Sequence, residues 1–278
     1  MTNKIILTQP SLKATAGAVR INKYLALHNY ASRREADVLI AKGLVKINGK
    51  KASLGDKVFE GDKVEVKNSQ KLKDNKYYVY YKPKGIETIL SKQNPSSLSA
   101  SARQGKSIKE IAGFPKDFFP VGRLDKDSHG IIIMTNDGRI TGKLLEPDSG
   151  HEKEYRVKVD KDISHLFVKL MASGIKLENP ARTYRSARMN RSGGIPFGTG
   201  GFKTKPAIIK KVDEYTFDIV LTEGKKHQIR RMCAALGYQV RDLKRIRIMN
   251  VKIGSLKQGQ KRELQGAELS NFLKKLGL

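Results

Sequence analysis

The chain has 278 residues, 38% of them hydrophobic, and its 55 Lys and Arg against 27 Asp and Glu give a net charge of +28. This length allows one large or two ordinary domains. No apolar stretch approaches the roughly 20 residues of a membrane span, and the single cysteine excludes an internal disulfide and a multi-cysteine zinc site. Twelve basic and six acidic residues in 1–66 give +6, which leaves +22 for the rest. Because both parts are basic, we expect a polyanionic partner, most simply nucleic acid.

The N-terminal stretch is small and polar and has no usable period. It lacks the basic start, apolar block and cleavage site of a signal peptide. We therefore expect a disordered leader over residues 1–18 and a cytoplasmic protein that does not bind membranes.

Residues 19–66 are predicted to form a small α+β unit. A first helix is expected in RINKYLALHNY, and a second opens with the capping box Ser32-x-x-Glu35 and stops at Gly43. The following stretch alternates apolar and polar residues around Asn-Gly and Gly-Asp pairs, which is typical of short strands. Residues 67–76 are polar and charged and read as a linker.

A larger unit is predicted over residues 77–278. Strands are expected at 77–82, 130–135, 153–159, 207–212, 215–222 and 247–252, and helices at 138–146, 162–173, 227–236 and 267–275. Few of these elements form β-helix-β crossovers, so the pattern favours an α+β fold with a mixed, mostly antiparallel sheet. The Ser-rich stretch 91–107 and the Gly-rich stretch 189–205 are expected to be surface loops.

The segment VGRLDKDSHGIIIMTNDG (121–138) places Asp125 and Asp127 before an apolar run typical of a buried strand. DKDSHG partly matches a calcium loop, but the twelfth position is Asn136 instead of Glu, and a strand follows where a helix belongs. A two-metal nuclease would need further acids that the neighbourhood lacks. An ordinary solvated aspartate and a functional carboxylate both remain open. An ionised carboxylate at the edge of a buried strand needs a counter-charge.

The segment TEGKKHQIRRMCAALGY (222–238) could supply that charge. If it is helical, Arg230 flanks an apolar stripe and can reach inward to a partly buried carboxylate. Arg231 lies nearly opposite the stripe and would meet solvent or phosphate, and a solvated face remains the alternative for either arginine. Cys233 lies on the stripe, so we expect a core residue and not a nucleophile.

The segment HEKEYRVKV (151–159) alternates as a strand, with Tyr155 on the same face as Val157 and Val159. A tyrosine on an inward face is commonly a core residue. In an RNA-binding cleft it could also be a stacking platform for an exposed base.

These three segments resemble the signature segments of bacterial ribosomal-RNA pseudouridine synthases of the RsuA/RluB/RluE/RluF branch, and the wording of HEKEY and QIRRMC is closest to the RluF type. The stretch RINKYLALHNYASRREADVLIAKGLVKINGKKA is similar to the S4 RNA-binding domain that precedes the catalytic domain in this branch. The resemblance covers about residues 19–265, with the segments in the expected order. It implies an S4-like domain over 19–66 and an α+β pseudouridine synthase catalytic domain over 77–278.

The resemblance implies roles for four residues. Asp125 would be the catalytic nucleophile, and Tyr155 would stack on the target base and could take part in proton transfer. Arg230 would pair with Asp125, and Arg123 would fill the gap that the target base leaves. The reaction detaches uridine from C1′ of its ribose and rejoins it through C5, so it needs no redox step, hydrolysis or group donor. We therefore expect no cofactor and no metal.

RNA contacts are expected from the S4-like unit and from Arg231. In the S4-like unit the residues fall around helix starts and the hairpin, where they can meet phosphates: Arg20, Lys23, Arg33, Arg34, Lys46 and Asn48. The RluF-like wording favours large-subunit (23S) rRNA. Small-subunit rRNA or tRNA remain alternatives, as does a non-catalytic S4-containing ribosome-assembly factor. We expect a monomer.

Overall fold

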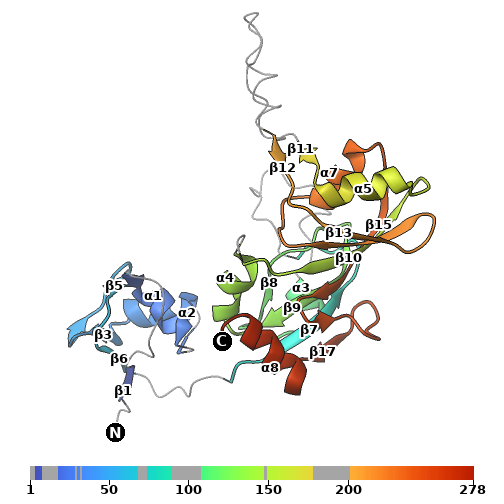
Figure 1. The fold of residues 1–278 in the computed structure, drawn as a ribbon. Coiled ribbons are helices and arrows are strands. Elements are labelled where there is room, and N and C mark those ends of the chain that lie inside the picture. The colour runs from blue at the N-terminus through green and yellow to red at the C-terminus, as the bar shows by residue number, and fades with distance from the viewer. Residues whose placement is uncertain are drawn as a thin grey trace, which may run out of the picture.

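The computed structural model shows the N-terminal and larger units as separate bodies of secondary structure (Figure 1). The described residues are 4–7, 18–28, 30–31, 33–67, 74–88, 108–146, 149–177 and 201–278. The expected loop at 91–107, most of the loop at 189–205 and linker residues 68–73 lie outside them. No helix among the described residues is long and apolar enough to cross a membrane.

The N-terminal unit packs two helices on short strands. Its elements are β1 (Lys4–Leu7), β2 (Val19–Arg20), α1 (Ile21–Leu27), α2 (Arg33–Ala41), β3 (Val45–Ile47), β4 (Lys50–Lys51), β5 (Lys57–Val58) and β6 (Val64–Lys67). The main sheet has the order β1-β6-β3-β4, and β2 pairs with β5. Ile21, Ala36 and Val64 are fully buried in a core that the two helices share with the sheet. The predicted α+β unit is thus confirmed.

The expectation of a disordered leader is wrong for residues 4–7. They form β1, which pairs antiparallel with β6 from Lys4 opposite Lys67 to Leu7 opposite Val64. The four-residue stretch KIIL is too short to show a period in the sequence, so only its pairing with a distant strand identifies it. The rest of the leader, except Ala18, lies outside the described residues.

The larger unit is built on one nine-stranded sheet. Its strands are β7 (Tyr77–Lys82), β8 (Phe119–Val121), β9 (His129–Thr135), β10 (Lys153–Val159), β13 (Ile208–Lys211), β14 (Thr216–Leu221), β15 (Val240–Ile248), β16 (Val251–Lys252) and β17 (Lys261–Glu263). A further pair is β11 (Lys176–Leu177) with β12 (Phe202–Lys203), and the helices are α3 (Ile108–Ile111), α4 (Arg139–Leu145), α5 (His165–Ser173), α7 (Gln228–Ala235) and α8 (Gly266–Lys275).

The strand order of the large sheet is β13-β14-β10-β15-β9-β7-β17, with β16 beside β15 and β8 beside β9. Only the pairing of β15 with β9 is parallel, so the predicted mixed, mostly antiparallel sheet is confirmed. The strand expected at 247–252 is wrong in its extent. β15 begins at Val240, and the chain turns back at Met249, whose φ is +52°, to form β16. The turn contains no glycine or proline, so the sequence did not mark it.

Two hydrophobic cores occupy the helix-covered parts of this sheet. In the first, α4 and α8 pack on β7 and β9 through residues such as Ile140, Phe272 and Ile131. In the second, α5 and α7 pack on β10 and β14. Figure 1 shows α5 and α7 together at one part of the sheet and α4 and α8 at another. β15 contributes to both cores, so the site between them is built on its side chains.

Strand β9 is buried on both faces. Ile131 and Ile133 belong to the core under α4, whereas Ile132 and Met134 pack with an aromatic cluster that contains Tyr80. All seven residues of β9 are buried. The apolar run after Asp125 is therefore the central strand that the sequence indicated, and it fixes the loop before it.

Candidate active site

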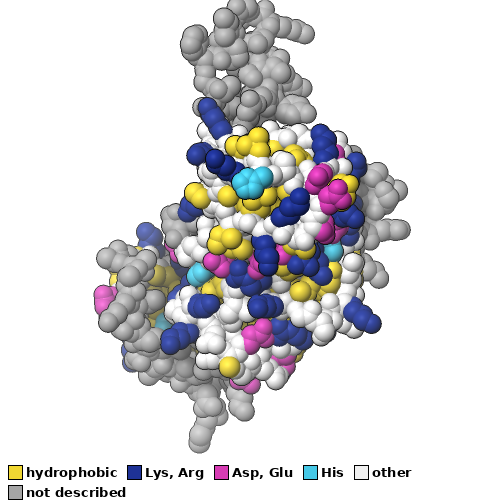
Figure 2. Space-filling view, turned by 45° about the vertical axis from the view of Figure 1, so that its right-hand side comes forward, with side chains coloured by type: hydrophobic (Ala, Val, Ile, Leu, Met, Phe, Trp, Pro, Cys, Tyr) yellow, Lys and Arg dark blue, Asp and Glu magenta, His cyan; other side chains and the backbone are white. Residues whose placement is uncertain are grey.

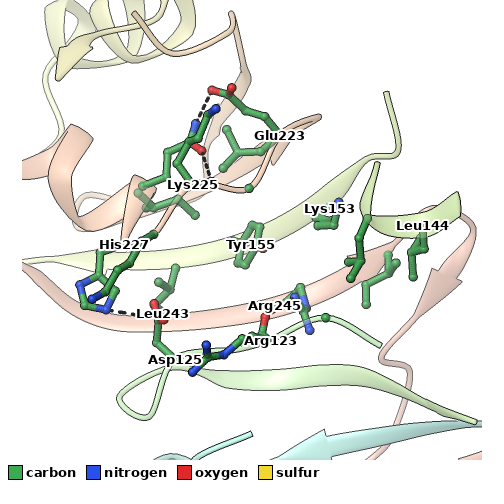
Figure 3. Close-up of a pocket in the computed structure, with 18 of the residues that line it drawn as sticks. Arg123, Asp125, Leu144, Lys153, Tyr155, Glu223, Lys225, His227, Leu243 and Arg245 are labelled. Atoms are coloured by element: carbon green, nitrogen blue, oxygen red, sulfur yellow. Dashed lines mark hydrogen bonds and ion pairs between the residues drawn. The ribbon is translucent and has the colours of Figure 1, made fainter. Parts of the chain in front are cut away.

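A cavity of about 700 Å³ opens between the two cores (Figure 3). Apolar side chains from α4, β14 and β15 line part of it, namely Leu144, Leu145, Leu221, Leu243 and Ile248. The polar side chains of its lining include Arg123, Asp125, Lys153, Tyr155, Lys205, Glu223, Lys225, Lys226, His227, Gln228 and Arg245. The structure thus brings together Asp125 and Tyr155, which the sequence singled out from segments 30 residues apart.

Asp125 lies in the loop between β8 and β9 and lines the cavity. Its side chain is 41% exposed, and its Oδ1 lies 3.6 Å from Nε2 of His227. The backbone before it is held by Thr88, whose hydroxyl donates to the Leu124 carbonyl at 2.7 Å and accepts from the Leu124 amide at 3.0 Å. The carboxylate is therefore accessible while its loop is fixed.

Lys82 supports the same loop from the end of β7. Its ammonium group is fully buried and donates to the carbonyl oxygens of Ile86 at 2.6 Å and Pro83 at 2.9 Å, with the Lys126 carbonyl at 3.5 Å. Burial lowers the pKa of Lys82 to about 8, against the opposing effect of the nearby Asp125 carboxylate. Sequence reasoning missed this residue, although a lysine that ends an apolar strand is a signal worth weighing.

Tyr155 lies on β10 with its ring against the core under α5 and α7. It pairs across the sheet with Arg245 of β15 and Ile219 of β14. Figure 3 shows its ring above β15, in the cavity beside Asp125. The side chain is half-buried, so one part of the ring packs on the core and another lines the cavity.

Arg230 does not form the expected ion pair with Asp125 in this structure. Its Nη2 donates to the backbone carbonyl of Asp127 at 3.0 Å, and its Nη1 donates to the Val240 carbonyl at 3.3 Å. The side chain leaves α7 toward the loop, as the helical geometry predicted, but it reaches the loop backbone and not the carboxylate. The Asp125 carboxylate instead faces the imidazole of His227, which adopts a left-handed conformation with φ +52° at the start of α7.

Neither Arg123 nor Arg231 contacts the Asp127 carbonyl as Arg230 does. Arg123 is exposed and lines the cavity, and its carbonyl accepts from Nη1 of Arg245 at 3.4 Å. The guanidinium of Arg231 lies 5.4 Å from the centre of the Phe202 ring and is half-buried. Arg231 therefore packs on Phe202 of β12, and its contact with phosphate stays a prediction.

The residues of the N-terminal unit that were expected to contact RNA are mostly accessible. Exposed or half-exposed side chains belong to Arg20, Lys23, Arg33 and Lys46, whereas only the backbone of Arg34 is described. Asn48 is exposed as well, and its amide nitrogen donates to Asp62 at 2.7 Å while its amide oxygen accepts from the Lys63 amide at 2.8 Å. With φ +49°, Asn48 also serves the hairpin turn, and its contact with RNA stays a prediction.

The charge of the larger unit is spread over its surface. Figure 2 shows Lys and Arg side chains across the visible face and gathered near its middle, with few acidic side chains among them. Some arginines are neutralised locally, as Arg156 is by Asp218 at 2.9 Å. The remaining positive surface suits a phosphate backbone.

The single thiol of the chain does not line this cavity. Cys233 is fully buried, and burial raises the pKa of its thiol to about 12, so the core assignment is confirmed. No cluster of three or more His, Cys, Asp or Glu side chains that could hold a metal ion occurs within the described part of the chain.

Comparison with known proteins identifies both units. The family model described as RNA pseudouridylate synthase matches residues 76–235, and that of the S4 domain matches residues 19–64. The chain is 36% identical to the dual-specificity RNA pseudouridine synthase RluF of Escherichia coli K12, over 92% of this chain and 79% of that protein. It is 30% identical to the ribosomal large subunit pseudouridine synthase B of Bacillus subtilis, over 91% and 95%. A crystal structure of a pseudouridylate synthase matches with a TM-score of 0.58 at 25% identity and covers 93% of this chain and 99% of its own. The chain therefore belongs to the RNA pseudouridine synthase family and is an enzyme that acts on RNA.

Proposed function

We propose that this enzyme isomerises uridine to pseudouridine in large-subunit (23S) ribosomal RNA, as a cytoplasmic monomer without a cofactor. The observation that carries the catalytic part is the position of Asp125 at a cavity that is lined in part by apolar side chains and whose polar side chains are mostly basic. The target rests on the net charge of +28 and on the Bacillus subtilis relative, whose name specifies the large ribosomal subunit. Small-subunit rRNA and tRNA are the alternative targets, and the dual-specificity name of the Escherichia coli relative supports more than one substrate.

In this proposal Asp125 is the nucleophile. A carboxylate can attack C1′ of the ribose or C6 of the base, and its 41% exposure leaves room for either approach. The target nucleotide must leave its stack to enter the cavity, which costs a few kcal/mol and favours RNA that is already distorted. The leucine and isoleucine side chains of the lining would then exclude water from the detached uracil.

Three other side chains complete the proposed site. Tyr155 would stack on the uracil ring, and Arg123, exposed at the rim, would fill the gap left in the RNA. Arg230 would pair with Asp125 once RNA is bound, by moving from the Asp127 carbonyl to the carboxylate of the same loop. In the absence of RNA it holds the loop backbone.

The two units divide the work. We propose that residues 19–66 tether the enzyme to RNA through exposed basic side chains, while the catalytic domain over 77–278 selects the uridine. Removal of the tether should weaken RNA binding uniformly and reduce its salt dependence, without changing which uridine is modified.

The test is carbodiimide primer-extension mapping of total rRNA from cells with and without this protein. Cells without it are complemented with the wild type, Asp125→Asn or the matched control Asp127→Asn, since Asp127 is exposed in the same loop and does not line the cavity. One uridine stop should vanish without the protein and return with the wild type and Asp127→Asn, but not with Asp125→Asn.

Three results would contradict the proposal or one part of it. A stop that Asp125→Asn restores would remove Asp125 from catalysis. No change in any rRNA, together with a ribosome-assembly defect that Asp125→Asn repairs, would favour the non-catalytic assembly factor. A change confined to tRNA would leave the chemistry in place and refute the 23S target.

A further inference from the structure

Arg245 is a buried cation in the lining of the cavity whose hydrogen bonds are incomplete. The residue is 4% exposed, its Nε donates to the Ile131 carbonyl at 2.7 Å, and its Nη1 donates to the Arg123 carbonyl at 3.4 Å. Its Nη2 is buried and finds no acceptor among the described residues. An unsatisfied charged donor in a protein interior is costly, so such a group points to an acceptor that arrives with a ligand.

A second cation lines the cavity close to the first. Lys153 lies two residues before Tyr155 on the same face of β10, and its Nζ donates to the His151 carbonyl at 3.3 Å. Burial lowers the pKa of Lys153, and the charge of Arg245 lowers it further, which places the two cations within electrostatic reach. Figure 3 shows Arg245 between Asp125 and Lys153, beneath the ring of Tyr155.

The carboxylates of the cavity do not neutralise this pair. The Asp125 carboxylate lies beside the imidazole of His227, and Glu223 accepts from the side chain of Gln228 at 2.7 Å and from the Lys205 amide at 2.9 Å. Neither Lys153 nor Arg245 forms an ion pair with a described residue. Two positive charges that are held close together in a partly buried site favour the binding of an anion.

The reaction creates such an anion inside the cavity. When the C1′–N1 bond breaks, its electron pair stays on the uracil, and the negative charge is shared between N1, O2 and O4. The C5–C1′ bond then forms with a pair from the ring, C5 loses its proton and N1 takes one up, so nothing else is consumed. If Asp125 instead adds first to C6, the charge collects on O4. In both routes a carbonyl oxygen of the pyrimidine becomes negative.

We propose that Lys153 and Arg245 form a cationic floor that binds this carbonyl oxygen and stabilises the charge that the pyrimidine acquires during the reaction. The inference rests on the proposed site around Asp125 and adds two catalytic residues to it. Donors fixed in advance in a dry site stabilise developing charge more than water does, because they need no reorganisation. The free Nη2 of Arg245 supplies one such donor, and the ammonium group of Lys153 supplies another.

The test uses full-length enzyme and an RNA fragment that contains the mapped target, labelled with tritium at C5 of uridine. Lys153→Met removes the charge and keeps the length of the side chain, and Lys169→Met is the matched control because Lys169 is exposed on α5 outside the cavity lining. We expect Lys153→Met to lower the single-turnover rate of tritium release about 100-fold with RNA affinity within two-fold of the wild type. Lys169→Met should change neither.

A second substrate separates electrostatic stabilisation from a structural role. 5-Fluorouridine at the target yields a more stable uracil anion because fluorine withdraws electrons. Consumption of the fluorinated nucleotide should therefore be slowed less by Lys153→Met than the reaction of uridine is. Equal losses for the two substrates, or a rate within three-fold of the wild type for uridine, would overturn the inference.

Arg245→Lys provides the second variant, since it keeps the charge and removes the free Nη2 in a residue whose full removal could prevent folding. Arg245→Lys should also slow the reaction of uridine more than that of the fluorinated nucleotide, by smaller factors than Lys153→Met does. Its thermal midpoint should be close to that of the wild type. If the wild type itself releases no tritium, the proposed function fails. If the wild type is active, Asp125→Asn is inactive and both floor variants behave as the wild type, only the present inference fails.

Discussion

Replacing Gly130 with alanine would drive a methyl group into the backbone of β15. Gly130 has φ +111°, and a Cβ built on it would lie 2.2 Å from the carbonyl oxygen and 2.6 Å from the amide nitrogen of Arg245. These two residues are register partners in the one parallel strand pair of the large sheet. The contact is with backbone on both sides, so no side-chain rotation can relieve it.

The expected loss of stability has two parts. A non-glycine residue at this φ costs about 1–3 kcal/mol in backbone strain. The strands must also separate by roughly 1 Å, because real Cβ contacts are rarely shorter than 3.0–3.4 Å. That movement disrupts the pairing of β9 with β15, and loss of one or two buried hydrogen bonds costs about 1–3 kcal/mol more. We expect a total of about 4 kcal/mol, a large share of the 5–15 kcal/mol typical of a domain.

The assay is urea unfolding of Gly130→Ala followed by circular dichroism, with Gly142→Ala as the matched control. Gly142 lies in α4 and is exposed, and a Cβ added there would meet nothing within 4 Å, so alanine should stabilise the helix by about 0.5–1 kcal/mol. The free energy of unfolding should therefore fall for one variant and rise for the other. Because Arg245 moves with β15, the folded fraction of Gly130→Ala should also lose isomerase activity.

A Gly130→Ala variant that unfolds within 1 kcal/mol of the wild type would refute this reasoning. It would mean that β9 and β15 do not approach as closely as the structure shows. Loss of stability with full activity in the folded fraction would instead separate the strand contact from the position of Arg245.

Three further predictions follow from the site and its support. Asp137 is fully buried, and although burial raises the pKa of its carboxyl, hydrogen bonds from the Arg139 guanidinium lower it below the usual value. The stability that Asp137 contributes is therefore present above its unfolded pKa of about 3.9 and is lost as the pH falls through the lower folded pKa. Asp137→Asn should destabilise the protein at pH 7 by about 3 kcal/mol. The free energy of unfolding of this variant should also fall less steeply than that of the wild type as the pH is lowered. Tyr155→Phe should keep RNA affinity within two-fold of the wild type in a filter-binding assay, whereas Tyr155→Leu should weaken binding of the flipped base by about 1–3 kcal/mol. If Tyr155→Leu bound RNA as tightly as Tyr155→Phe, the result would argue against stacking. His227→Asn tolerates the left-handed backbone and removes the imidazole beside Asp125, so it should slow single-turnover tritium release several-fold without loss of stability. An unchanged rate would show that His227 has no catalytic part.

The candidate site could be predicted in part from three short segments. Asp125 was marked by its place before a buried apolar run, and Tyr155 by its place on the inward face of an alternating strand, and the structure brings both to one cavity. The helical period of α7 predicted the direction of the Arg230 side chain, but it did not predict which group accepts its hydrogen bond. The helical angle sends the side chain toward the loop, but only the folded loop decides whether the guanidinium meets a backbone carbonyl or the carboxylate.

The local sequence pattern and the composition alone determined several elements of secondary structure and the class of partner. Strand β10 and the types of the long helices follow from periodicity, because each buries one face, whereas β7 follows from a continuous run of Tyr and Val that is buried on both faces. The charge of +28 indicated a nucleic-acid partner before any fold was known. These properties depend on neighbouring residues or on composition, so the sequence contains them directly.

Only the tertiary structure decided which cations share the cavity and its supporting loop. Lys82, Lys153 and Arg245 come from β7, β10 and β15, and no one of these segments shows by itself that the three residues lie near one another. Their convergence depends on the strand order and on the close approach of β15 to Gly130, which set the register that turns Arg245 inward. Register joins residues more than a hundred positions apart, and the periodicity of one strand carries no information about its partner.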